Sequence, residues 1–119
     1  MSELLERITA HATEQTRPVI EVPEWGDENG PLKIYVRPLS MEQVSLLELS
    51  SAKDKFKALV DLIVMKAERE DGARVFQAKE KAALMSVADS ELVIRVAEEI
   101  GKIVGIATKE TDEAAAEGN

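Results

Sequence analysis

The stretch Leu32-Lys33-Ile34-Tyr35-Val36-Arg37-Pro38-Leu39-Ser40-Met41-Glu42-Gln43 places two different periodicities next to each other. Residues 32–37 alternate largely apolar and polar side chains and include β-branched residues, which is typical of a strand. After Pro38, Ser40 and Gln43 have the spacing of a capping box, in which the two side chains satisfy free amides of the first helical turn. The stretch therefore predicts a strand that ends at a proline and a helix that begins at Ser40.

A second strand is predicted immediately upstream. Residues 19–22 read Val-Ile-Glu-Val and are again dominated by β-branched side chains. The nine residues between the two runs, 23–31, include two prolines, two glycines and an asparagine. These residue types favour turns, because they impose or tolerate backbone angles that other residues avoid. The pattern predicts an antiparallel β-hairpin with a loose connecting loop.

A short amphipathic helix is predicted over residues 2–14. Its apolar side recurs at helical spacing and consists of Leu4, Leu5, Ile8 and His11. Charged side chains occupy the other side. Pro18 disfavours a helical conformation of the residue before it, so we expect this helix to end before the hairpin.

Apolar residues recur every three or four positions through most of the chain after Ser40. The pattern is interrupted near Ser51, at Asp71-Gly72 and before Asp89. Glycine commonly ends a helix, and aspartate is a preferred capping residue at a helix start. The predicted helices therefore span residues 40–50, 53–70, 77–85 and 90–104, and a short extended piece is predicted over 73–76.

Together these elements predict an α+β fold, with a mainly α-helical single domain and a small antiparallel β-hairpin. Three parts are expected along the chain. Residues 1–17 form an amino-terminal amphipathic helix or arm, and residues 18–106 form the hairpin plus helical core. Residues 107–119 are small and acidic and cannot repay the entropy of ordering, so we expect a disordered tail.

Composition narrows the classes of function. A chain of 119 residues suffices for one hydrophobic core, and its aromatic share of only 3% favours packed aliphatic helices. The absence of cysteine excludes disulfide frameworks and thiolate chemistry. The formal charge of −8 opposes binding to a phosphate backbone, so no nucleic-acid partner is expected.

The amino-terminal residues and the length of the apolar stretches indicate the cellular location. The first residues are acidic where a secretory signal would be basic. No stretch approaches the 18 or so continuous apolar residues of a membrane-spanning helix, because charges interrupt the longest candidates. We expect a cytoplasmic protein without a membrane partner.

The residues that carry chemistry are sparse. His11 is the single histidine, so a Ser-His-Asp arrangement would depend on one residue in a short helix. The six glycines do not form a phosphate-binding loop. Residues 27–30 lack the ligand spacing of a calcium loop. We therefore expect no enzyme activity, no catalytic residues, no cofactor and no metal site.

Two groups of residues are candidates for contact with a protein partner. Trp25 and Tyr35 are amphipathic aromatic residues, a type enriched at protein interfaces. Trp25 has two interpretations, closure of a small core under the hairpin or an exposed anchor, and the first is favoured. The second group lies on the apolar face of the last predicted helix and comprises Leu92, Val96 and Ile100.

The segments Glu21-Val22-Pro23-Glu24-Trp25-Gly26, Ile34-Tyr35-Val36-Arg37-Pro38-Leu39-Ser40 and Glu70-Asp71-Gly72-Ala73-Arg74-Val75-Phe76 resemble tail assembly chaperones of long-tailed, siphovirus-type bacteriophages. The resemblance covers roughly residues 19–106. It implies a homo-oligomer in the host cytoplasm that binds the tape-measure protein and is absent from the mature virion. It also implies that a frameshifted longer form recruits the tail-tube protein.

Two alternative functions remain open at this point. A structural phage tail or head-completion subunit would share the size, the acidity and the lack of catalytic residues. A small acidic regulatory or inhibitor protein would use its negative charge to occupy a basic surface of its target.

Overall fold

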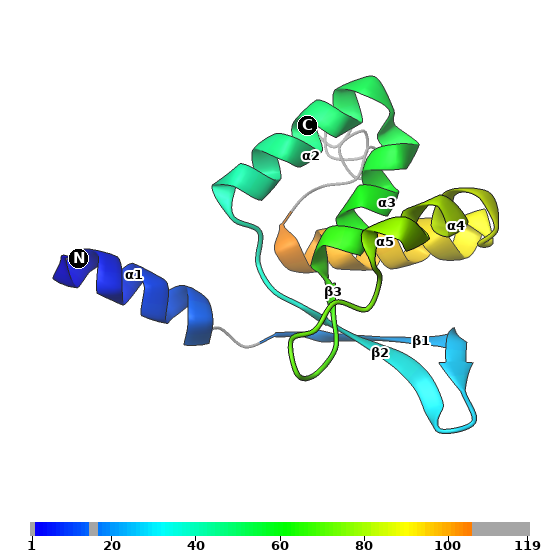
Figure 1. Ribbon diagram of the computed structural model, residues 1–119, viewed down its shortest axis with the longest axis horizontal. Coiled ribbons are helices and arrows are strands. Elements are labelled where there is room, and N and C mark those ends of the chain that lie inside the picture. Colours follow the sequence, from blue (N-terminus) through cyan, green and yellow to red (C-terminus); the bar gives the residue numbers. More distant parts are fainter. Residues whose placement is uncertain (1, 15–16, 106–119) are drawn as a thin grey trace, which may run out of the picture.

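The computed structural model describes residues 2–14 and 17–105 of the chain. An amino-terminal helix stands apart, and the other elements pack into one domain of helices and a small sheet (Figure 1). In chain order the elements are α1 (Glu3–Glu14), β1 (Val19–Asp27), β2 (Gly30–Val36), α2 (Met41–Lys53), α3 (Lys55–Lys66), β3 (Ala67–Glu68), the 3-10 helix η1 (Ala78–Glu80), α4 (Lys81–Ser86) and α5 (Ser90–Val104).

The predicted hairpin is present, and it is part of a three-stranded antiparallel sheet in the order β1-β2-β3. Successive side chains of a strand point to opposite faces of a sheet. The face turned to the interior carries four buried side chains, Ile20, Val22, Ile34 and Val36. The alternation seen in the sequence is therefore the alternation between core and surface.

The hairpin becomes irregular between Val22 and Asp27, within the segment predicted as a loose loop. Gly26 comes so close to the second strand that a Cβ atom there would collide with the backbone of Gly30 and Pro31. A residue without a side chain is required for this approach. The position of the turn thus depends on a specific glycine.

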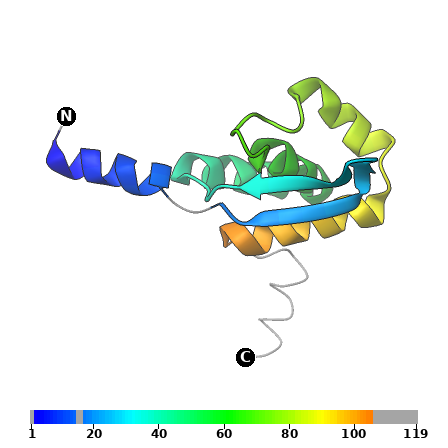
Figure 2. The same cartoon turned by 90° about the horizontal axis from the view of Figure 1, so that it is seen from below.

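The interior face of the sheet is covered by α5, which runs along the hairpin (Figure 2). α3 packs against α5, and α2 packs against α3 but not extensively against the sheet. The most deeply buried large side chains come from the sheet, α3 and α5, and are Ile34, Ile63, Ile100, Val22, Val36 and Val96. The core therefore lies where these three elements meet.

The capping box predicted at Ser40 is confirmed. The Oγ of Ser40 accepts a hydrogen bond from the N–H of Gln43 at 3.2 Å, and the Gln43 Oε1 accepts one from the N–H of Ser40 at 3.0 Å. Lys66, only 5% exposed, donates to the same Gln43 oxygen at 3.2 Å and to the carbonyl of Pro38 at 3.1 Å. Burial lowers the pKa of Lys66. Its ammonium group thus ties α3 to the start of α2.

Two aspartates are the N-caps of longer helices, Asp54 of α3 and Asp89 of α5. Asp54 accepts hydrogen bonds from the N–H groups of Phe56 and Lys57, both at 3.1 Å, and Asp89 accepts one from the N–H of Glu91 at 2.9 Å. These bonds satisfy amides that have no partner inside the helix. The prediction of a cap at Asp89 is confirmed, whereas the break predicted near Ser51 lies at Asp54.

The helix predicted over 53–70 is too long. It ends at Lys66, because Ala67 and Glu68 pair with β2 as a third strand. The extended piece predicted over 73–76 is not a strand and makes only an isolated bridge between Arg74 and Glu68. The first error has a long-range cause, since pairing with Val36 and Tyr35, far away in sequence, sets the backbone of Ala67 and Glu68.

The fold class is confirmed as α+β, mainly helical and a single domain with a small antiparallel sheet. The helix predicted at the amino terminus is present as α1. The acidic tail predicted over 107–119 lies outside the described residues.

Candidate partner-binding surface

Trp25 lies near the turn of the hairpin. It is half-buried and meets the ring of Phe76 edge to face, with ring centroids 5.8 Å apart and an interplanar angle of 81°. This geometry is favourable for two aromatic rings. Trp25 therefore occupies the position expected from the interpretation favoured above, closure of a small core.

Tyr35 lies beside a cluster of charged side chains that meet at Glu68. The guanidinium of Arg17 stands 5.1 Å from the ring centroid and also pairs with Glu68 at 3.1 Å. Arg37 pairs with the same Glu68 oxygen at 2.9 Å, and Arg17 donates to the carbonyl of Arg69 at 3.0 Å. The cluster holds Arg17, the first described residue after α1, against Glu68 of β3.

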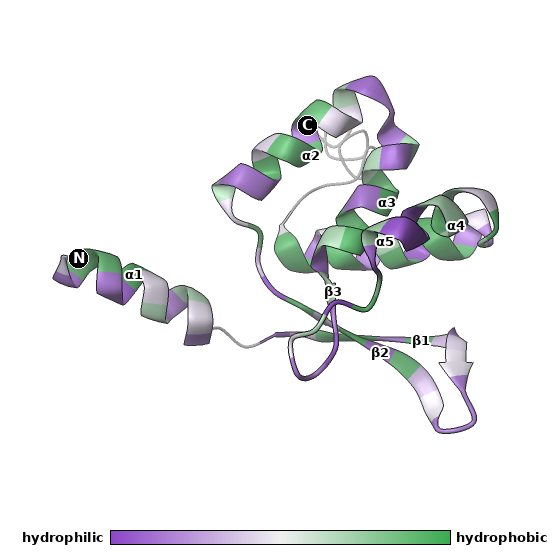
Figure 3. Ribbon diagram, viewed as in Figure 1, coloured by the Kyte–Doolittle hydropathy of each residue, from purple (hydrophilic) through white to green (hydrophobic). Residues whose placement is uncertain are grey.

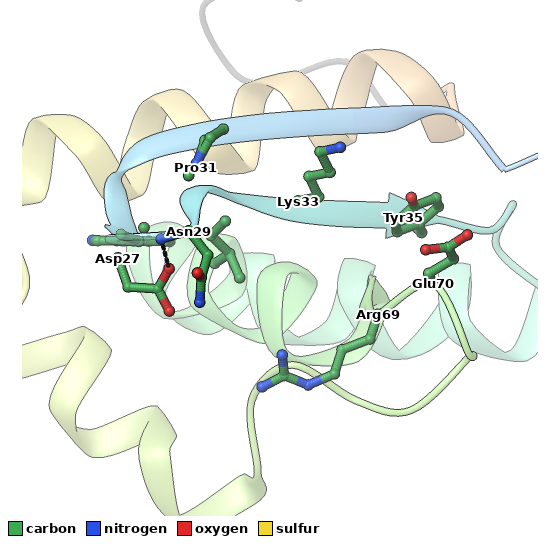
Figure 4. A pocket seen from close by; sticks show the side chains of 11 residues that line it. Asp27, Asn29, Pro31, Lys33, Tyr35, Arg69 and Glu70 are labelled. Carbon is green, nitrogen blue, oxygen red and sulfur yellow. Dashed lines mark hydrogen bonds between the residues drawn. The ribbon is translucent and has the colours of Figure 1, made fainter.

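A shallow hollow of about 380 Å³ lies between the hairpin and the loop after β3 (Figure 4). Its charged side chains are of both signs and comprise Asp27, Lys33, Arg69 and Glu70. Sites for small ligands are usually more enclosed and more apolar. The hollow suits contact with a polar protein surface better than enclosure of a small molecule.

The three candidates on the last helix have different environments. Val96 and Ile100 have no exposed surface, because they pack into the chain's own core. Leu92 is half-buried against the same core. The expectation that Val96 and Ile100 form an external surface needs correction, since a partner would reach them only if the core opened.

The apolar surface that is available lies elsewhere, first of all on α1. None of its residues is buried, and Leu4, Leu5 and Ile8 are 58%, 50% and 54% exposed. Figure 3 shows that green apolar segments alternate with purple polar ones along this helix. Such an amphipathic helix normally packs against something. Within the described chain, no element packs extensively against it.

A second exposed apolar surface lies on α2. Leu47 faces α3 and is buried, whereas Leu46 and Leu49 are 52% and 63% exposed. Residues three apart lie on the same side of a helix, so these two leucines share one flank. Lys53 lies four positions after Leu49 and extends that flank. The sequence pattern did not predict this surface, although the scatter of apolar residues around α2 is its signal.

A partly buried ion pair and a hydrogen bond hold α2, α3 and α4 together. Asp61 of α3 accepts a hydrogen bond from the Ser50 hydroxyl at 2.6 Å and pairs with Lys81 of α4. Burial raises the pKa of Asp61, but the bonds from Lys81 and Ser50 outweigh it, so the pKa lies below its ordinary value. Asp61 thus connects α2, α3 and α4 through one carboxylate.

An exposed ion pair connects α5 to the hairpin. The guanidinium of Arg95 donates to both oxygens of Glu24, at 2.9 and 3.0 Å. Hydrogen bonding by Arg95 lowers the pKa of Glu24, and the same interaction raises the pKa of Arg95.

Within residues 2–14 and 17–105, no three His, Cys, Asp or Glu side chains are grouped so that they could hold a metal ion. His11 lies on the exposed α1. None of the helices described is both long enough and apolar enough to cross a bilayer.

Comparisons with models of protein families, with curated proteins and with solved structures gave no match.

Proposed function

We propose that this protein is a phage tail assembly chaperone that uses α1 to bind an apolar helical segment of the tape-measure protein in the host cytoplasm. The observation that carries the proposal is the exposed apolar face of Leu4, Leu5 and Ile8 on a helix that its own domain leaves uncovered. An amphipathic helix of this kind can lie in a groove of, or along, another helical protein. The sequence resemblance over residues 19–106 supports the choice of partner.

The size of the apolar face suits a contact that must be reversed. Burying the exposed half of each of these three side chains stabilises a complex by about 1 kcal/mol apiece. One copy would therefore bind weakly. Several copies on a long client would bind tightly together, because linked contacts add through effective concentration. They would still leave one by one when tube subunits take their place.

Co-expression with the tape-measure protein of the same phage tests the proposal. We expect the two proteins to co-purify, and we expect more of the tape-measure protein in the soluble fraction than when it is expressed alone. If neither occurs with the unaltered chain, the proposed function is wrong. Mass spectrometry of purified virions is the second measurement, because a chaperone is absent from them and a structural subunit is present.

A matched pair of variants tests the face itself. Leu5→Ser with Ile8→Ser removes the apolar face of α1, and we expect co-purification to fall at least tenfold, since about 1 kcal/mol is lost at each position. Ala10→Ser with Thr13→Ser introduces serine away from that face and should leave binding unchanged. Equal binding by the two variants would exclude α1 as the binding element.

A further inference from the structure

The third strand leaves part of the edge of the sheet uncovered. β3 pairs only with Tyr35 and Val36, although β2 begins at Gly30. After β3 the chain turns away from the sheet, because the N–H of Gly72 donates to the carbonyl of Arg69 at 2.9 Å. In the part of the chain that the structure describes, β2 before Tyr35 therefore has a partner strand on one side only. The shallow hollow between the hairpin and the loop after β3 lies against this uncovered edge.

The direction of the backbone groups identifies Lys33 as the residue that faces the uncovered edge. The N–H of Val36 donates toward β1, to the carbonyl of Pro18 at 3.0 Å. Along an antiparallel strand these groups point alternately to one neighbour and to the other. Ile34 therefore also points toward β1, whereas Tyr35 and Lys33 point away from it. Tyr35 meets β3 there, but no strand of the described residues reaches the N–H and C=O of Lys33.

The residue that would pair with Lys33 is held elsewhere. Continuing β3 in the same register would place Glu70 opposite Lys33. Instead, the guanidinium of Arg17 donates to the carbonyl of Glu70. Free N–H and C=O groups at a sheet edge can pair with an added strand. Pro31, the next residue to face this edge, has no N–H, so the edge accepts only a short segment.

β3 itself shows which side chains suit this edge. Ala67 faces the core and has no exposed surface. Glu68 faces the opposite side, where its carboxylate pairs with Arg17 at 3.1 Å and with Arg37 at 2.9 Å. A strand added in line with β3 would continue this alternation between the core side and the outer side. The edge thus combines an apolar inner side with a basic outer side.

The outer side of the uncovered part is also basic. Lys33 is exposed, and together with Arg69 it lines the hollow between Asp27 at the end near the turn and Glu70 at the other end (Figure 4). Glu21 is opposite Lys33 in β1. Within residues 2–14 and 17–105, however, neither Lys33 nor Arg69 forms an ion pair. An acidic side chain beside Lys33 would be favoured, because opposite charges on neighbouring strands attract.

The inner side of the same part is apolar and incompletely covered. Leu32 points to the same side of the sheet as the buried Ile34 but is itself only half-buried. Trp25 is also half-buried and lines the same hollow as Leu32. An apolar side chain placed against both would remove further apolar surface from water, which stabilises a contact.

We propose that the edge of β2 at Lys33 binds a short extended segment of another polypeptide, which adds antiparallel to β2 in line with β3. One residue of that segment exchanges both backbone hydrogen bonds with Lys33 and is acidic, because its side chain lies beside the Lys33 ammonium. The neighbouring residue, beside Leu32, is apolar, because its side chain meets Leu32 and Trp25. The site does not involve α1 and therefore goes beyond the proposed function.

NMR titration of the full-length chain with the capped peptide Thr-Val-Glu-Val-Thr tests the proposal. We expect a progressive shift of the Lys33 amide signal and slower hydrogen exchange of that amide. The expected Kd is on the order of 1 mM, because the contact consists of a few backbone hydrogen bonds and one apolar side chain. A control peptide carries a methyl group on the glutamate nitrogen. It keeps every side chain but cannot donate to the Lys33 carbonyl, so binding should weaken about fivefold.

Exchange of charges tests the chemistry of the occupant. Lys33→Glu should weaken binding of the peptide. A second peptide, with lysine in place of glutamate, should bind this variant more tightly than it binds the unaltered chain. Lys57→Glu reverses another exposed lysine, in α3, and should leave binding unchanged. Circular dichroism checks that each variant is folded.

Several results would overturn the proposal. They are an unmoved Lys33 amide signal, equal binding of the methylated peptide, and binding that is indifferent to the exchange of charges. A Lys33 amide that exchanges slowly without peptide would also overturn it, because a segment of the chain itself would then occupy the edge. Leu5→Ser with Ile8→Ser should leave peptide binding unchanged, and its loss would mean that the peptide binds α1 instead. Peptide binding and client binding can thus fail independently.

Discussion

α1 and α5 are the most strongly amphipathic of the described helices with twelve or more residues, yet they lie in opposite environments. α5 buries Val93, Val96, Ala97, Ile100 and Gly101, whereas α1 buries nothing. Both sequences carry an apolar stripe that water disfavours. The comparison teaches that helical periodicity identifies a face that favours burial and leaves open which surface will bury it.

The difference follows from what each helix has beside it. α5 lies along the hairpin, whose interior face offers four aliphatic side chains, and the Glu24–Arg95 pair joins the two elements at the surface. α1 is separated from the domain by a short linker, and the core is already filled by the sheet, α3 and α5. The apolar face of α1 is thus left exposed.

The largest expected effect comes from truncating one isoleucine in each helix. Ile100→Ala should lower the free energy of unfolding by about 2–5 kcal/mol, because it opens a cavity in the core. Ile8→Ala should change it by less than about 0.5 kcal/mol, as expected for an exposed position. Urea unfolding followed by circular dichroism measures both. Equal losses would mean that α1 is part of the cooperative domain.

A smaller loss is expected at the hairpin turn. Gly26→Ala places a Cβ atom against the backbone of Gly30 and Pro31, and relieving that overlap should cost about 1–3 kcal/mol of stability. Thermal unfolding measures the effect. Thr13→Ala in α1 is the matched control outside the domain, and its melting temperature should equal that of the unaltered chain. An unchanged melting temperature for Gly26→Ala would show that the turn can relax.

Removing the serine at the start of α2 or of α1 should affect the stability of the domain differently. Ser40 caps α2 inside the domain, and Ser2 accepts a hydrogen bond from the N–H of Leu5 at 3.1 Å at the start of α1. Ser40→Ala should cost about 1 kcal/mol of global stability. Ser2→Ala should reduce the helicity of α1 and leave the unfolding midpoint of the domain where it is. A shift of that midpoint by Ser2→Ala would contradict the independence of α1.

The smallest expected effect is a change in how stability depends on pH in acid when Asp61 is replaced. Because the pKa of Asp61 is lowered in the folded chain, its contribution is fully present above the unfolded value of about 3.9 and is lost as the pH falls through the lower folded value. Asp61→Asn should therefore reduce the pH dependence of stability below about pH 4. Deleting residues 2–14 should leave that dependence intact. Acid titrations followed by circular dichroism compare the three chains.

Much of the local structure could be predicted from short stretches. The box at Ser40, the cap at Asp89 and the strand alternation around Ile34 each depend on neighbours within a few residues. The end of α3 could not be predicted in this way. Lys66-Ala67-Glu68 continues a helical pattern, and only pairing with Tyr35 and Val36 makes the last two residues a strand.

The candidate surface was less predictable than the fold. The chemistry of Trp25 and Tyr35 predicted a contact with a partner, and the structure places both at the hairpin hollow, partly covered by Phe76 and by Arg17. The apolar face of Val96 and Ile100 predicted a second contact, but both side chains belong to the core. The exposed flank of Leu46 and Leu49 could not be predicted, because exposure depends on which neighbours a helix has.

The order of the elements, the caps and the identity of the apolar stripes can be read from the residues alone, because they depend on backbone sterics and on hydrogen bonds a few positions apart. The third strand, the choice of α5 over α1 to cover the sheet and the Arg17–Glu68 anchor belong to the tertiary structure. They arise from contacts between residues far apart in sequence, and several helices compete for one limited apolar surface. Which helix is left uncovered is settled only when that surface is full.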